Sequence, residues 1–456
     1  MKKNKTIYEL TPSQDVVRMQ LLFSLDKRVI NILMSAQSEK ELDFTVMQKA
    51  IDIVCERHDC LRLRFIKKGF KLYQYFSDKS LVGEIPTLEF KTKEEQEKFI
   101  LKHCKKPIKY LKGKVLEPYF IKTYDNKYMI FVKVCHLILD TYGLNVIFKD
   151  IFDIYNCLIN NTEFPKAPVQ FEEIVKKELK TKHDANLNKK REEFFTDYYT
   201  KREEPYYAGF AGQKTELGRK NFEKRTMKMF LVNNQTHAFM HKIDKNLGDR
   251  IIQFCEQNKI SPANFLFYAC TVTQSKLNKN IDKMLQLELC NLRATMMEKN
   301  CSGTKVQSLG CYVELNNESS AIEDLKHFCA NQNMFYRYLG FSDMQFQNLT
   351  HKIWKSSAIR TYYAMSFSFT PFVKPEGVEF QMYSNGKFAL PIYFAILFDV
   401  KTHEMQCVYD CQKKLTSEKQ VEEFQKDFVG VIEQILDNEN IIVKDIKLVE
   451  DENGKI

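Results

Sequence analysis

One eight-residue segment constrains the fold more than any other part of the chain. Residues 128–135 (Tyr-Met-Ile-Phe-Val-Lys-Val-Cys) are almost continuously apolar and rich in β-formers, which is the pattern of a strand buried on both faces. Further on, residues 144–158 carry apolar side chains at the i, i+3, i+4 and i+7 spacing of an amphipathic helix. We therefore expect a buried strand that leads, through a loop beginning at His136, into a packed helix.

Helical and strand patterns alternate along the rest of the chain. Apolar spacing predicts a helix over residues 43–58, and a hairpin of two strands follows it across Lys67-Lys68-Gly69. Helices are also expected over 244–255 and from Ser261, strands over 283–290, 312–315 and 364–369, and a hairpin over 391–400 and 404–409. Ser417 with Gln420 three residues later forms a capping box that begins a last helix. These patterns predict an α/β protein with mixed sheets.

The length and composition allow two lobes. The chain has 456 residues, 44% of them apolar, which is enough for two domains of ordinary size or one large two-lobed unit. Residues 171–205 form the most polar stretch, so we place the passage between the lobes there. The predicted division is an N-terminal lobe over 1–175, a polar connection over 176–205 and a C-terminal lobe over 206–456.

Several classes of protein are disfavoured. Only 15 residues are glycine, and neither G-x-x-x-x-G-K nor G-x-G-x-x-G occurs, so the common nucleotide folds are not expected. Thirteen scattered cysteines without a C-x-x-C spacing favour free thiols in a reducing compartment. The N-terminal lysines precede no apolar run, and no apolar stretch approaches 18 residues, so we expect no signal peptide and no membrane span. The expected location is the cytoplasm.

The histidines offer the clearest candidate chemistry. His136 has an acidic residue, Asp140, four positions later, and an imidazole at the end of a buried strand suits proton transfer. A buried histidine satisfied by a backbone carbonyl fits the same segment. The spacing of His237 and His241 could let them share a metal if it lay on a helix, but no third ligand is evident, so no metal is expected. The basic runs at 105–106 and 189–191 lack the pattern of a nucleic-acid module, and we expect solvated faces and no nucleic acid there.

Four segments in order resemble the condensation domains of nonribosomal peptide synthetases, within the chloramphenicol acetyltransferase-like superfamily. They are Leu10-Thr11-Pro12-Ser13-Gln14 (family L-T/S-P-x-Q), Arg57-His58-Asp59-Cys60-Leu61-Arg62-Leu63-Arg64-Phe65 (R-H-x-x-L-R-T/S-x-F), Cys135-His136-Leu137-Ile138-Leu139-Asp140-Thr141 (H-H-x-x-x-D-G), and Asn291-Leu292-Arg293 with Leu309-Gly310-Cys311-Tyr312-Val313. The second segment is the most specific match. The resemblance spans residues 8–436.

The resemblance implies a fold and residue roles. It implies two acetyltransferase-like lobes arranged as a V-shaped pseudo-dimer around a central tunnel. His136 would be the catalytic residue, acting as base or positioner for the acceptor nucleophile. Asp140 would pair with Arg293 and hold the loop, and Cys135 and Gly143 would support the motif structurally. Cys135 replaces the first motif histidine, Thr141 stands where the family has glycine, and Gly143 comes two positions late.

The resemblance also implies a function. We expect a free-standing acyltransferase that moves an acyl or aminoacyl group from a phosphopantetheine thioester, on a carrier protein or coenzyme A, to an amine. There are two alternatives. The chain could be an O-acyltransferase with an alcohol acceptor, or a catalytically silent member of the family that binds a carrier or partner protein. No cofactor is expected to be bound by the chain, since phosphopantetheine comes with the donor, and we expect a monomer. The net charge of +10 would favour encounter with an acidic carrier protein.

Overall fold

The computed structural model describes residues 5–22, 24–228, 234–388 and 390–449. Part of the N-terminal segment considered above, residues 1–4, therefore lies outside the described residues. The chain forms two compact units. Unit 1 runs to Asp184 and also contains Asn291–Gln307 and Pro371–Lys387, whereas unit 2 contains Ala185–Cys290, Ser308–Thr370 and the chain from Phe388 onward. The two short segments of unit 1 come from the half of the chain that the sequence assigned to the second lobe.

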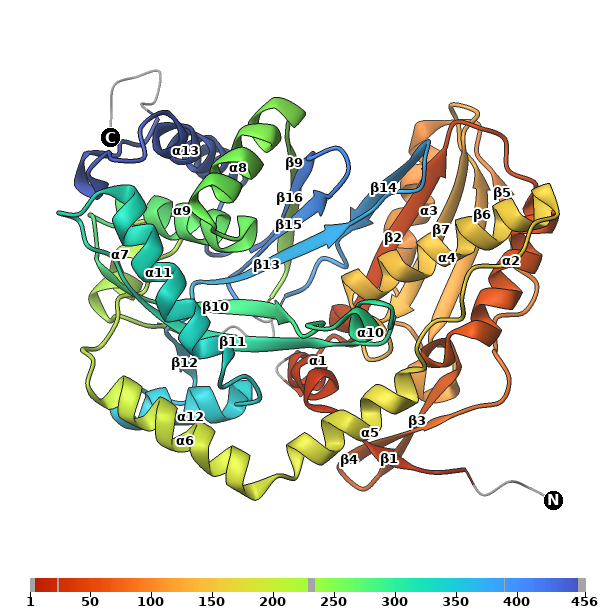
Figure 1. Cartoon of the computed structure of the whole chain (residues 1–456), viewed down its shortest axis with the longest axis horizontal. Helices are drawn as coiled ribbons and strands as arrows, with labels where there is room; N and C mark the ends of the chain where they lie inside the picture. The colour runs from red at the N-terminus through yellow and green to blue at the C-terminus, as the bar shows by residue number, and fades with distance from the viewer. Residues whose placement is uncertain (1–4, 23, 229–233, 389, 450–456) are drawn as a thin grey trace. The chain divides into compact units, whose positions relative to one another are not determined.

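A five-stranded mixed sheet forms the centre of unit 1. Its order is β14 (Val378–Tyr383), β2 (Asn31–Ser38), β7 (Tyr128–Cys135), β6 (Leu116–Lys122) and β5 (Thr87–Glu89). The pairs are antiparallel except β5 with β6. The predicted apolar strand is thus confirmed as β7, buried between β2 and β6. Figure 1 shows β14, in blue, beside β2, in red, although more than 300 residues separate them in the sequence.

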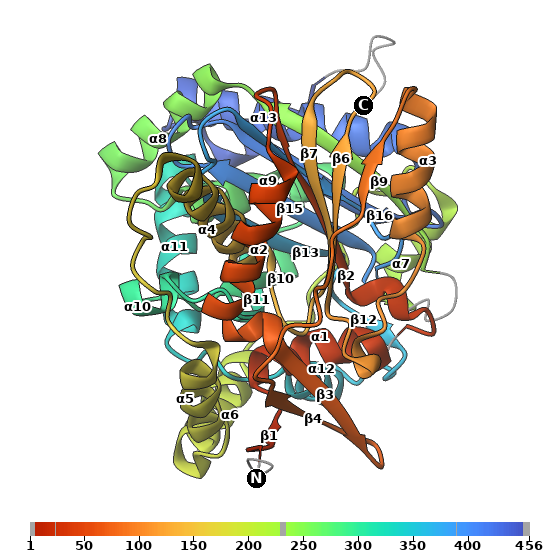
Figure 2. The same ribbon diagram turned by 90° about the vertical axis from the view of Figure 1, so that its right-hand side faces the viewer.

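Helices cover both faces of this sheet. On one face, α2 (Phe44–Arg57) packs against α4 (Thr141–Asn160), the two helices predicted from apolar spacing. On the other, α3 (Lys93–Cys104) places Ile100 and Cys104 against β2, β6 and β7. Figure 2 shows the sheet with α3 on one side and α2 and α4 on the other. The start of α2 follows from its sequence, because the Asp43 carboxylate accepts the backbone N–H groups of Thr45 and Val46.

A small sheet and short elements complete unit 1. The small sheet has the order β1 (Tyr8–Glu9), β4 (Lys71–Phe76), β3 (Leu63–Lys68), so the predicted hairpin across Gly69 is confirmed. The remaining elements are α1 (Pro12–Leu22), η1 (Lys27–Ile30), η2 (Asp59–Arg62), η3 (Tyr110–Lys112), α5 (Phe171–Lys182) and α10 (Met296–Lys299). Part of the polar stretch expected to form a passage is therefore a helix of unit 1.

Unit 2 is built on a six-stranded sheet. Its order is β11 (Val306–Glu314), β10 (Lys283–Asn291), β13 (Met365–Phe372), β15 (Ile392–Asp399), β16 (Met405–Gln412) and β9 (Thr236–Ile243). A two-stranded sheet pairs β8 (Met227–Lys228) with β12 (Arg360–Thr361). The ends of β10, β11 and β13 lie in segments that belong to unit 1. The parallel β10–β13 pair and the antiparallel β15–β16 hairpin make the large sheet mixed, which confirms the predicted mixed α/β class.

Helices pack on the large sheet through aromatic rings. Phe267 of α9 stacks on Phe367 of β13, and Phe428 of α13 meets Phe394 of β15 edge to face. The helices are α6 (Ala185–Thr200), α7 (Glu216–Glu223), α8 (Lys245–Asn258), α9 (Pro262–Leu277), α11 (Ala321–Tyr336), α12 (Asp343–Ile353), α13 (Glu418–Asp437) and η4 (Val443–Asp445). The predicted capping box at Ser417 and Gln420 is confirmed at the start of α13.

Two segments of unit 2 differ from what the sequence patterns suggested. His237 and His241 lie on strand β9, not on a helix, because this segment pairs with β16 along its whole length. Arg191 is buried, with Nη1 donating to the Asn188 side chain, whereas its neighbours Lys189 and Lys190 are exposed as expected. No helix within the described ranges is both long and apolar enough to cross a bilayer.

Candidate active site

The loop that carries His136 begins where β7 ends. The backbone N–H of His136 donates to the Ile30 carbonyl at 2.8 Å, and that of Ile138 donates to the Cys135 carbonyl at 3.0 Å. Four residues later, Asp140 caps the first turn of α4. The strand, the turn and the helix thus hold the backbone on both sides of the histidine.

The His136 imidazole has one engaged nitrogen. Its Nδ1 lies 3.0 Å from the Leu139 carbonyl oxygen, and a carbonyl can only accept, so Nδ1 carries the proton. In the neutral ring Nε2 therefore holds the lone pair, and it has no hydrogen-bond partner among the described residues. Burial lowers the pKa of His136 below its usual value, with the Asp140 carboxylate partly opposing this shift. The side chain is thus a neutral base at neutral pH.

The Asp140 carboxylate is fully occupied. It accepts hydrogen bonds from the backbone N–H groups of Gly143, at 2.7 Å, and Lys305, at 2.8 Å. It also accepts a bidentate pair from the Arg293 guanidinium at 2.8 and 3.0 Å. The side chain is only 9% exposed. With four hydrogen bonds, this carboxylate holds backbone segments together and has little capacity left for a ligand.

All five N–H donors of Arg293 are used within unit 1. Besides the two bonds to Asp140, Nε donates to the Cys301 carbonyl, Nη1 to the Asn291 side chain and Nη2 to the Gly303 carbonyl. The guanidinium also lies 4.6 Å from the centre of the Tyr142 ring. The structure therefore brings together the two residues that the sequence paired, Asp140 and Arg293, in a buried ion pair.

Residues 302–305 run alongside the histidine loop. Gly303 forms an antiparallel β-bridge with Leu139, and the backbone N–H of Thr304 donates to the Ile138 carbonyl at 3.2 Å. The Thr304 hydroxyl donates to the His136 carbonyl at 2.7 Å. We call residues 302–305 the clamp segment, because their hydrogen bonds fix the loop from His136 to Asp140. Sequence reasoning did not find Thr304, since a lone threonine carries no motif signal.

The clamp segment explains which position requires glycine. A Cβ atom on Gly143 would lie 1.7 Å from the Ser302 carbonyl oxygen, so only glycine allows this approach. Thr141, at the first position of α4, is not among the residues with positive φ, so its backbone needs no glycine. The close approach in this chain therefore falls at position 143 and not at 141.

Two other motifs support the same loop. In the first, the Gln14 amide donates to the Leu137 carbonyl at 2.9 Å. In the second, His58 lies between the Ser302 hydroxyl at 2.8 Å and the Asp150 carboxylate of α4 at 3.1 Å. One of the four segments that carry the resemblance is the histidine loop itself. Each of the other three, although distant in sequence, hydrogen-bonds to the loop or to the clamp segment. This arrangement gives each motif a mechanical role.

A buried ionic cluster extends from the clamp segment. The Lys305 ammonium lies 3.2 Å from the Glu298 carboxylate and 3.7 Å from that of Glu178. Lys177 also pairs with Glu298, and the Ser13 hydroxyl donates to Glu178. The two lysines help lower the pKa of Glu298 to about 2, although burial opposes them. No sequence pattern predicts this cluster, because lysines and glutamates are usually exposed.

The Cys135 thiol is in an environment that disfavours nucleophilic reactivity. It is fully buried at the end of β7, and desolvation raises the pKa of its thiol to about 12, which disfavours the reactive thiolate. The thirteen cysteines of the chain are all free thiols. Across the described ranges, no group of three or more His, Cys, Asp and Glu side chains is arranged to hold a metal ion.

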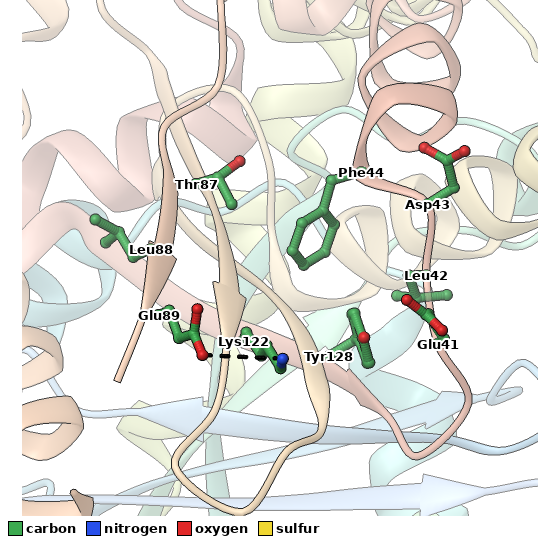
Figure 3. A pocket seen from close by; sticks show the side chains of 9 residues that line it. All are labelled: Glu41, Leu42, Asp43, Phe44, Thr87, Leu88, Glu89, Lys122 and Tyr128. Carbon is green, nitrogen blue, oxygen red and sulfur yellow. Dashed lines mark ion pairs between the residues drawn. The ribbon is translucent and has the colours of Figure 1, made fainter. Parts of the chain in front are cut away.

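A pocket lies at the opposite end of β7. It has a volume of about 710 Å³, and Figure 3 shows its lining residues, Glu41, Leu42, Asp43, Phe44, Thr87, Leu88, Glu89, Lys122 and Tyr128. Tyr128 begins β7 and Cys135 ends it, so about 23 Å of strand separates this pocket from the histidine loop. Its carboxylates are already engaged. Asp43 caps α2, Glu89 pairs with Lys122, and Glu41 accepts a hydrogen bond from Tyr128.

Comparison with known proteins places the chain in one family. The model of the family described as "Condensation domain" matches residues 4–455. A solved mutant starter condensation domain of rhizomide synthetase RzmA, in complex with C8-CoA and Leu-SNAC, aligns over 98% of both chains with a TM-score of 0.80 and 14% identity. The first condensation domain of the calcium-dependent antibiotic synthetase, in complex with a substrate analogue, aligns over 97% of this chain and 99% of that chain with a TM-score of 0.80 and 11% identity. At these identities the likeness shows the fold.

Two further proteins are similar to this chain, one in structure and one in sequence. The condensation domain from Monacolin K polyketide synthase MokA aligns over 96% of this chain and 99% of that chain, with a TM-score of 0.79 and 12% identity. Among curated proteins, tyrocidine synthase 2 of Brevibacillus parabrevis is 23% identical over 158 residues. That match covers 34% of this chain and only 4% of the length of the synthase.

Proposed function

The chain belongs to the condensation domain family, and on that premise we propose that it transfers an acyl or aminoacyl group from a phosphopantetheine thioester to an amine, forming an amide. The observation that carries the proposal is the state of His136. Its Nδ1–H is held by the Leu139 carbonyl, and its Nε2 lone pair has no partner among the described residues. A neutral base of this kind is what an attacking amine requires.

In the proposed reaction the acceptor amine attacks the thioester carbonyl carbon. A C–N bond forms and the C–S bond breaks. Nε2 of His136 accepts the proton that the amine nitrogen loses, and the departing thiolate takes up a proton in turn. Proton transfer of this kind contributes typically about 10²- to 10⁴-fold to the rate. The lowered pKa of His136 supports the role, because it keeps the ring unprotonated near neutral pH.

Asp140 and Arg293 are positioning residues in this proposal. Arg293 binds Asp140 at the end of the loop and the Gly303 carbonyl of the clamp segment, and each of the atoms that could serve chemistry is already hydrogen-bonded. Cys135 and Gly143 likewise act through structure, one as a buried side chain and the other by allowing close approach to Ser302. The chemistry is thus assigned to His136 alone.

We take acyl-CoA and acyl carrier protein as the two possible donors. C8-CoA and Leu-SNAC are bound by the rhizomide synthetase domain of the same fold, which supports a thioester donor here. In each case phosphopantetheine arrives as part of the donor. An alcohol in place of the amine would give an ester by the same proton transfer. A silent member of the family would bind the donor without turnover.

The test is product formation by the purified chain. Octanoyl-CoA and a panel of amino acid thioesters are supplied together, and products are measured by mass spectrometry. We expect an amide product from the wild type, and a rate lower by about 10²- to 10⁴-fold for His136→Ala. The matched control is His327→Ala, which changes an exposed histidine on α11 and should leave the rate unaltered.

Three outcomes would contradict the proposal. Equal rates for the wild type and His136→Ala would remove the histidine from the mechanism. An ester formed from an alcohol acceptor, with no amide from any amine, would make the chain an O-acyltransferase. Tight binding of a carrier protein with no product from the wild type would support the silent alternative.

A further inference from the structure

The tip of the β3–β4 hairpin carries an unusually exposed aromatic side chain. Phe70 is 95% exposed, more than any other large apolar residue that the structure describes. It occupies the second position of a two-residue turn whose first residue, Gly69, has a φ of 57°. Positive φ at that position is typical of the tight turns that match strand twist. The ring is therefore presented on a rigid hairpin, which Figure 2 shows projecting from the body of unit 1.

Lysines surround this ring. Lys67, Lys68 and Lys71 are all exposed, and Lys68 lies directly opposite Lys71 in the strand register. Like charges in directly opposite positions repel each other and destabilise a hairpin. Between Asp59 and Asp78 the chain has five basic residues and no acidic one. The hairpin thus concentrates positive charge at the position where folding alone would disfavour it.

The end of α1 carries two further exposed leucines. The Arg18 guanidinium donates to the Phe70 carbonyl at 3.0 Å, which places α1 beside the tip. Leu22 follows Arg18 by one helical turn and so lies on the same face of α1. Leu22 is 61% exposed and Leu25 is 78% exposed. We call Phe70, Lys67, Lys68 and Lys71 the hairpin patch.

Two acidic residues on neighbouring elements lie against basic side chains. Asp15 of α1 pairs with Lys182 at 2.7 Å, and Glu9 of β1 pairs with His183 at 3.3 Å. On the outer face of the small sheet, the Lys68 and Lys5 ammonium groups lie 5.5 and 5.0 Å from the rings of Tyr73 and Tyr75. The field around the tip is therefore positive.

We propose that the hairpin patch docks the protein on an anionic membrane surface. An apolar ring at a convex tip suits a lipid interface, which can deform around it, whereas a protein partner would need a matching groove. Lysines around the ring reach phosphate and carboxylate groups of the lipid heads while their stems lie along the apolar boundary. An exposed aromatic side chain at a hairpin tip with lysines around it is the combination that favours such a surface.

The test is binding of the full chain to vesicles. Equimolar phosphatidylcholine and phosphatidylserine vesicles are compared with phosphatidylcholine alone by co-sedimentation. We expect binding only to the anionic vesicles, and weaker binding as salt is raised. Replacing the three lysines by glutamine should lower the binding constant on the order of a hundredfold. Phe70→Ser should lower it about tenfold.

A second triple variant provides the control. It replaces three exposed lysines of α6 and its end by glutamine, so the net charge falls by the same amount: Lys189, Lys190 and Lys201. Circular dichroism confirms that each variant is folded. Equal losses in the two triple variants would overturn the proposal, and so would equal binding to both kinds of vesicle. Failure of the wild type to bind vesicles, together with Phe70-dependent binding of an acidic protein, would instead assign the hairpin patch to a protein partner.

Discussion

Gly143→Ala tests whether the clamp segment holds the histidine loop. The added Cβ would lie 1.7 Å from the Ser302 carbonyl oxygen, whereas ordinary contact begins at 3.4 Å, so the two backbones must separate by about 1.7 Å. That shift breaks the two hydrogen bonds of Thr304 and the one from the Lys305 N–H to Asp140. The variant therefore loosens the loop without removing any catalytic atom.

The magnitude follows from the bonds lost. Two neutral hydrogen bonds at about 1 kcal/mol each and one to a carboxylate at about 2 kcal/mol sum to about 4 kcal/mol. Alanine in place of glycine in a helix stabilises the folded state by up to about 1 kcal/mol, which offsets part of this loss. We therefore expect a loss of about 3 kcal/mol in the free energy of unfolding, and faster hydrogen exchange in residues 136–144 and 301–305.

The assay compares two alanine variants. Gly83→Ala is the matched control, because a Cβ there meets no atom within 4 Å and the backbone has no positive φ. Urea unfolding is followed by circular dichroism, since the single tryptophan, Trp354, lies in unit 2 and would not report on unit 1. Equal stability of Gly143→Ala and the control, with unchanged exchange in the loop, would refute the role of the clamp segment.

Three further predictions concern buried polar groups. Arg293→Met should lower the free energy of unfolding by about 3–5 kcal/mol, because it leaves the Asp140 carboxylate buried without its partner, and in urea unfolding part of this loss should be recovered by adding Asp140→Asn. Thr304→Val should reduce kcat about tenfold with little change in KM, since a typical hydrogen bond to the His136 backbone is lost, whereas Thr304→Ser should retain activity. Burial raises the pKa of Glu288 to about 7, so ionisation of its carboxyl destabilises the fold increasingly as the pH rises from about 4.5 to 7. In unfolding experiments the free energy of unfolding of Glu288→Gln should therefore gain about 3 kcal/mol over that of the wild type across this window. An equal pH dependence of the two proteins would contradict this interpretation.

Local patterns were sufficient to predict several elements of the fold, among them the strand and the helix on either side of the histidine loop. Strand β7 follows from its apolar run, α4 from its apolar spacing, and the start of α13 from Ser417 and Gln420, because each depends on contacts within a few residues. The ion pair of Asp140 with Arg293 was expected from the resemblance, and the structure contains it. The catalytic role of His136 stays a prediction.

The remaining features depend on contacts between distant segments. Strand β14 pairs with β2, and the clamp segment belongs to unit 1 although it lies beyond residue 290 in the sequence. No pattern among neighbouring residues predicts either arrangement. Lys305 is buried because two carboxylates from other elements surround it, which no single stretch of sequence reveals. The spacing of His237 and His241 could not identify their element for a related reason, since residues four apart share a face on both a helix and a strand.

The central claim is that His136 is a neutral base with its proton on Nδ1. The most direct measurement is a 15N NMR titration of the histidine side chains, with the signal of His136 assigned by its absence in His136→Gln. We expect a neutral ring that is protonated at Nδ1 and unprotonated at Nε2, with a pKa below the ordinary value of about 6.5. A ring protonated at Nε2, or a pKa at or above that value, would contradict this claim.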